Sequence, residues 1–60
     1  MKWKEFIEQL LDNTSAEEIK MVFQEDVGNI IDGQLWTQEC ADARCKLVDE
    51  LVLERKLKTN

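Results

Sequence analysis

The sequence has no histidine, proline or tyrosine, and it holds only two glycines and one serine in 60 residues. Without histidine it lacks the commonest general base, the commonest metal ligand and every histidine-containing triad. Its glycines, Gly28 and Gly33, fit neither the dinucleotide-binding spacing nor the P-loop spacing. A chain this short also has little room for a desolvated pocket between paired carboxylates. The sequence therefore predicts a protein that is not an enzyme and that binds no metal and no cofactor.

Long apolar runs are missing as well. No apolar run exceeds three residues, and Glu5 and Glu8 interrupt the apolar residues near the N-terminus. These patterns predict neither a membrane span nor a signal peptide, so we expect a cytoplasmic protein. The two cysteines, Cys40 and Cys45, are five residues apart on one predicted helix, which separates them by roughly 8 Å. That distance is too great for a disulfide, and we expect two buried thiols.

Positive charge is in short supply in the first part of the chain. Residues 1–35 carry three lysines against eight acids, which accounts for the whole net charge of −5, and residues 36–60 are balanced. Such a surface would repel a phosphate backbone over most of its area. The residues that could still contact nucleic acid are Lys2 and Lys4, or the short basic strip Arg55, Lys56 and Lys58.

What the sequence does contain is typical of a helical domain. Hydrophobic residues make up 43% and charged residues 35%, and good helix formers dominate. The apolar periodicity predicts an all-α fold, a single domain over residues 1–60, with helices at 2–12, 15–32 and 38–58 and antiparallel neighbours. The apolar positions exceed what one core of this size can enclose. We therefore expect a homodimer or a larger assembly.

The predicted ends of these helices rest on capping residues. Thr14 with Glu17, or Ser15 with Glu18, forms a capping box for the second helix, and Thr37 caps the third. We expect the second helix to run through Gly28 and to stop at Gly33. The competing interpretation is a hairpin over residues 29–37, turning at Asp32-Gly33. It is less favoured because the flanking residues do not alternate apolar with polar.

Two charges fall inside predicted apolar faces. At 100° per residue, Asp26 lies on the apolar face of the second helix and Arg44 on that of the third. Buried charges need partners, so we predict that Asp26 pairs with Arg44, within the chain or across a dimer. The alternative is that each side chain reaches water at the margin of its stripe.

Three further features are candidate partner-binding surfaces. Leu53 and Leu57 lie one turn apart on the charged side of the third helix, where they form an apolar ridge unless the first helix covers them. Trp36, just before the third helix, is a candidate for a partly exposed anchor. The outer face of the second helix combines acids with an apolar centre, although such a charge run is usually only a solvated face: Glu17, Glu18, Met21, Glu25, Gly28 and Asp32.

These observations predict a small acidic helical protein–protein interaction or regulatory module. Small size, acidity and the lack of motifs are typical of the short accessory proteins that phages, plasmids and bacterial genomes encode. The alternative function is a dimeric regulator that binds RNA or DNA through the local basic strip. A structural subunit of a large assembly is a third class. The sequence identifies no specific partner.

Overall fold

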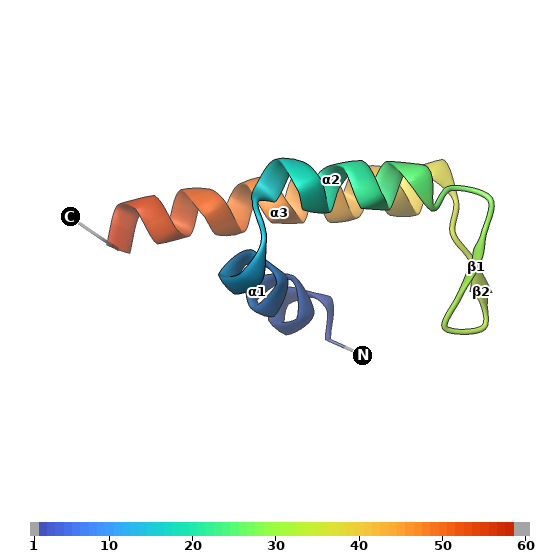
Figure 1. Ribbon diagram of the computed structural model, residues 1–60, viewed down its shortest axis with the longest axis horizontal. Coiled ribbons are helices and arrows are strands. Elements are labelled where there is room, and N and C mark those ends of the chain that lie inside the picture. The colour runs from blue at the N-terminus through green and yellow to red at the C-terminus, as the bar shows by residue number, and fades with distance from the viewer. Residues whose placement is uncertain (1, 59–60) are drawn as a thin grey trace.

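A computed structural model describes residues 2–58. Its elements follow the order α1 (Trp3–Asn13), α2 (Ala16–Glu25), β1 (Ile30–Ile31), β2 (Gln34–Leu35) and α3 (Gln38–Lys58). Helices α2 and α3 run antiparallel side by side, and α1 crosses beside them at an angle (Figure 1). The three predicted helices are therefore present, and the bounds predicted for the third match those of α3.

Capping side chains begin α2 and α3 where the sequence places them. The Ser15 side chain accepts a hydrogen bond from the Glu18 backbone N–H at 3.2 Å, and the Thr14 hydroxyl donates to the Glu18 carboxylate. The Thr37 side chain accepts from the Cys40 N–H at 3.2 Å. The contacts to the Glu18 and Cys40 N–H groups each satisfy a donor that has no partner within its helix.

The second helix is shorter than predicted. It ends at Glu25, with Asp26 as its C-cap, and a hairpin replaces the expected continuation to residue 32. The hairpin pairs Ile30 with Leu35 and turns through Asp32 and Gly33, which have φ angles of 52° and 79°. Positive φ at both central residues is the geometry that joins two strands most tightly. The favoured continuous helix was wrong, and the competing hairpin is the structure.

Gly28 explains where the helix stops. Its φ is +94°, a left-handed value that residues with side chains rarely adopt, and an added Cβ would meet no atom within 4 Å. Its N–H donates to the Trp36 carbonyl at 2.8 Å, and the Trp36 N–H donates to the Asn29 carbonyl at 2.8 Å. Gly28 is thus a conformational requirement of the hairpin. The prediction that Gly28 lies on the outer face of the second helix is wrong, because α2 ends three residues before it.

The core lies where the three helices and the base of the hairpin meet. The apolar face of the third helix faces this core, as predicted. The buried members of the core come from all four segments: Ile7, Ile19, Phe23, Trp36, Ala41, Val48 and Leu51. All four aromatic residues of the chain are close together, with Trp3 and Trp36 ring centroids 5.3 Å apart. The Trp36 Nε1–H donates to the Phe23 carbonyl at 2.8 Å. Trp36 is only 5% exposed, so its prediction as a partly exposed anchor is wrong.

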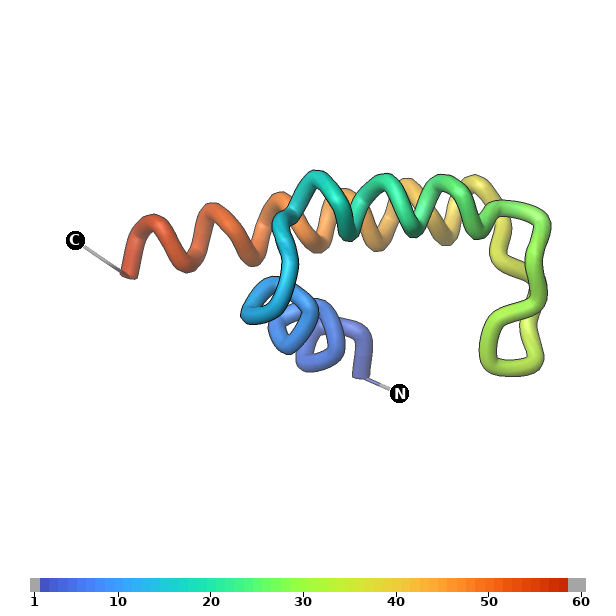
Figure 2. Tube along the Cα trace, viewed as in Figure 1, coloured from blue at the N-terminus to red at the C-terminus, as the bar shows by residue number. Residues whose placement is uncertain are grey.

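The antiparallel register leaves the end of α3 without a helical neighbour on the α2 side. Gln24 on α2 contacts Cys45 on α3. Lys20, four residues before Gln24, contacts Asp49, four residues after Cys45. Continuing this register by four residues places Ala16, the first residue of α2, level with Leu53 on α3. Residues 53–58 therefore extend past the start of α2, as the tube in Figure 2 shows. We call this segment the α3 overhang.

Candidate functional site

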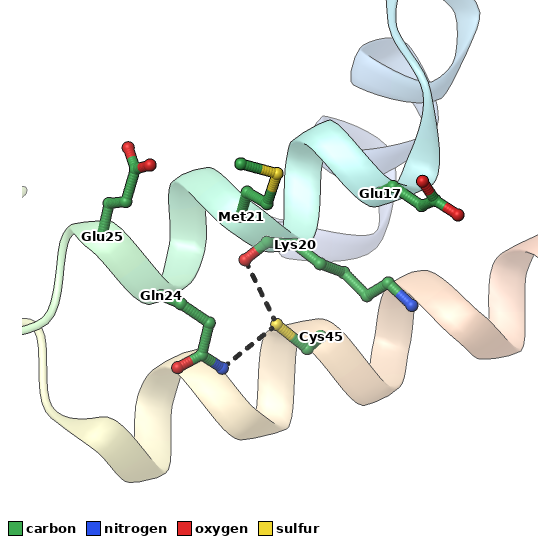
Figure 3. A pocket seen from close by; sticks show the side chains of 6 residues that line it. All are labelled: Glu17, Lys20, Met21, Gln24, Glu25 and Cys45. Atoms are coloured by element: carbon green, nitrogen blue, oxygen red, sulfur yellow. Dashed lines mark hydrogen bonds between the residues drawn. The ribbon is translucent and has the colours of Figure 1, made fainter.

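The surface between α2 and α3 is a shallow depression of about 560 Å³. Figure 3 shows the side chains that line it, and they include three of the predicted partner-binding residues, Glu17, Met21 and Glu25. Cys45 lies at its floor, where the thiol contacts the Gln24 side-chain amide at 3.6 Å and donates to the Lys20 carbonyl at 3.8 Å. Both cysteines are free thiols.

Polar contacts close this side of the helix pair. The Lys20 ammonium lies 2.8 Å from the Asp49 carboxylate, and this hydrogen bond, with its ion pairing, raises the pKa of Lys20. The Gln24 amide donates to Asp42 at 3.3 Å and accepts from Gln38 at 2.7 Å. These groups already satisfy one another across the two helices. A partner would have to displace them, which makes the depression a weak candidate for docking.

The remaining residues of the predicted acidic surface do not belong to this depression. Glu18 lies on the other side of α2, in the angle with α1, whereas Gly28 and Asp32 belong to the hairpin segment. The predicted acidic surface assumed a second helix that continues to residue 32. Because α2 ends at Glu25, these residues do not form one surface.

The angle between α1 and α2 holds an open apolar groove. It consists of two adjoining hollows of about 140 and 220 Å³ that share Leu10, Val22 and Phe23. Val22 is 51% exposed in its wall, although its position in the sequence assigns it to the core. The rest of the lining comes from α1, α2 and the hairpin: Trp3, Phe6, Thr14, Glu18, Ile19, Asp26, Ile31 and Trp36. We call this the α1–α2 groove.

Two arginines on α3 hold α1 at the angle that opens the groove. The Arg44 guanidinium lies over the Trp3 ring, 4.7 Å from its centroid, and 5.9 Å from that of Trp36. The Arg55 guanidinium donates to the Glu8 carbonyl at 2.9 Å and lies 3.1 Å from the Asp12 carboxylate. α1 is therefore fixed mainly to α3, and its side toward α2 stays partly open.

The predicted pair between Asp26 and Arg44 is not among the ion pairs of residues 2–58 in the single chain. Arg44 faces the indole rings instead, and its buried Nε atom has no hydrogen-bond partner within the described part of the chain. Asp26 caps α2 and lines the groove. Pairing of Asp26 with Arg44 across a dimer stays a prediction.

The predicted leucine ridge on α3 is exposed. Leu53 is 57% and Leu57 67% exposed, and α1 does not cover them. The neighbouring basic strip is less available to phosphate than the sequence suggests, because Arg55 is turned toward α1. Among residues 2–58, no helix is both long and apolar enough to cross a bilayer.

Comparison with known proteins adds no relative. The sequence matches no family model, and neither the curated proteins nor the solved structures give a match. The geometry therefore carries the functional argument. Sequence reasoning missed the groove, although one signal was present: too many apolar positions for one small core.

Proposed function

We propose that this chain is a small acidic protein–protein interaction module without catalytic activity, and that the α1–α2 groove is its docking surface. The observation that carries the proposal is an apolar groove whose wall includes a valine that is half exposed. Grooves between helices accept the apolar face of an amphipathic helix, which inserts side chains spaced three or four residues apart.

The total surface supports a partner as well. The chain exposes 4557 Å², whereas a compact monomer of this mass exposes about 4,100 Å². A standard interface removes about 800 Å² from each partner, less than a fifth of the area available here. Among residues 2–58, seven large apolar side chains are exposed, so a partner could bury apolar area without unfolding any element: Phe6, Met21, Val22, Ile30, Leu35, Leu53 and Leu57.

Site-specific photo-crosslinking in the native host tests the proposal. A photoreactive residue replaces Val22 in the groove or, as the matched control, the exposed Ala43 on α3. We expect a discrete protein adduct from position 22 and none from position 43, because only the groove contacts the partner. Equal labelling at both positions, or none at position 22, would contradict the proposal.

A further inference from the structure

We infer that the occupant of the α1–α2 groove is the α3 overhang of a second copy of this chain. The inference rests on the proposed function, because it names the partner of the same groove. It joins two of the apolar surfaces that the single chain leaves uncovered, the leucine ridge of the α3 overhang and the α1–α2 groove.

The ridge fits the groove in length and in chemistry. The groove follows α2 from Glu18 to Asp26, about 12 Å of helix, and the overhang of six residues is about 9 Å long. Leu53 and Leu57, at positions i and i+4, present two apolar side chains on one face. This is the spacing with which an amphipathic helix anchors in a groove.

The charges favour docking of the α3 overhang into the groove over face-to-face docking of two grooves. The two charged residues of the groove lining, Glu18 and Asp26, are both acids. The overhang carries the basic residues Arg55, Lys56 and Lys58 against one acid, Glu54. Arg55 is turned toward α1, so the exposed excess of positive charge comes from Lys56 and Lys58. Docking two grooves face to face would instead bring these acids against their copies, which is unfavourable.

A charge-exchange experiment tests the pairing. Val22→Lys places a positive charge in the groove, where it repels the basic overhang. Leu53→Glu with Leu57→Glu places two carboxylates on the apolar ridge, at the positions that would enter the groove, so that the acids of the groove repel them. In sedimentation equilibrium we expect each variant alone to associate at least about a hundredfold more weakly than the wild type. An equimolar mixture should form a one-to-one heterodimer, because the two new charges then attract.

Matched controls separate this contact from general stickiness. Met21→Lys lies next to Val22 on α2 but outside the groove, and Ala43→Glu lies on the exposed side of α3. Both should associate like the wild type. Circular dichroism checks that each variant is folded, and Val22→Gln replaces Val22→Lys if the lysine disturbs α2.

The outcomes are distinct. A wild-type dimer or an open chain of copies, together with rescue in the mixture, supports the inference. Normal association of either variant alone overturns it, since groove–groove contact would tolerate the two glutamates on the overhang and ridge–ridge contact would tolerate Val22→Lys. A wild type that stays monomeric at all concentrations also overturns it. The proposed function fails separately, by the crosslinking result, because an adduct with a different protein would support the groove and exclude the second copy.

Discussion

Alanine in place of Gly28 tests the connection between α2 and the hairpin. An L residue holds a left-handed conformation at a cost of about 1–2 kcal/mol. At φ +94°, with no atom within 4 Å of the added Cβ, this conformational cost has no steric addition. Alanine also restricts the unfolded chain, which stabilises the fold by about 0.4–1 kcal/mol. We therefore expect Gly28→Ala to lower the free energy of unfolding by about 1 kcal/mol.

The sign of the change in the free energy of unfolding distinguishes a left-handed residue 28 from one inside a helix. In a continuous helix the same substitution would raise the free energy of unfolding by about 1 kcal/mol. Urea unfolding followed by circular dichroism, at one fixed protein concentration, should show the midpoint lowered by about 1 M. Chemical synthesis with D-alanine at position 28 is the matched control, because its mirror-image preference favours positive φ and should raise the midpoint. An increase with L-alanine or a decrease with D-alanine would refute the assignment.

Three further substitutions test other contacts. Trp36→Phe removes the hydrogen bond to the Phe23 carbonyl and should lower the free energy of unfolding by about 1–3 kcal/mol in the same urea assay, and an unchanged midpoint would exclude the bond. The Thr37 hydroxyl donates to the Cys40 thiol at 3.3 Å and, with its other contacts, lowers the thiol pKa. Because the thiolate is the reactive form, Thr37→Val should move Cys40 alkylation to higher pH, and an unshifted profile by mass spectrometry would contradict this. Arg55→Met should increase amide exchange in α1 by less than about tenfold, with α2 unchanged, because the ion pair it removes is partly solvated.

Local pattern was enough to locate the helices. The periodicity of 3.6 and the cap at Thr37 predicted α3 to the residue. The hairpin was less favoured because the residues of its strands do not alternate between apolar and polar. Ile30 forms an exposed cross-strand pair with Leu35, while Ile31 turns toward the groove, so β1 carries an isoleucine on each of its two faces. A strand that is apolar on both faces cannot be told from a buried helix segment by periodicity alone.

In the candidate site as well, local sequence predicted some features, whereas contacts far apart in the chain determine the others. The exposure of Leu53 and Leu57 follows from their place on one helix, and the sequence predicted it. The α1–α2 groove depends on the angle at which α1 crosses, which contacts far apart in the chain determine. Arg44 contacts Trp3, which is 41 positions away in the sequence, and Arg55 contacts Glu8, which is 47 positions away. No window of local sequence contains such information.

The close approach of the two indoles makes the fold optically observable. Trp3 belongs to α1 and Trp36 to the end of the hairpin, and their rings are tilted by 43° at 5.3 Å between centroids. Two transition dipoles this near and not parallel couple to give a paired circular-dichroism band. That band would vanish if α1 detached while every helix stayed intact. The protein thus carries an unlabelled spectroscopic reporter of docking, separate from the signal of its helices.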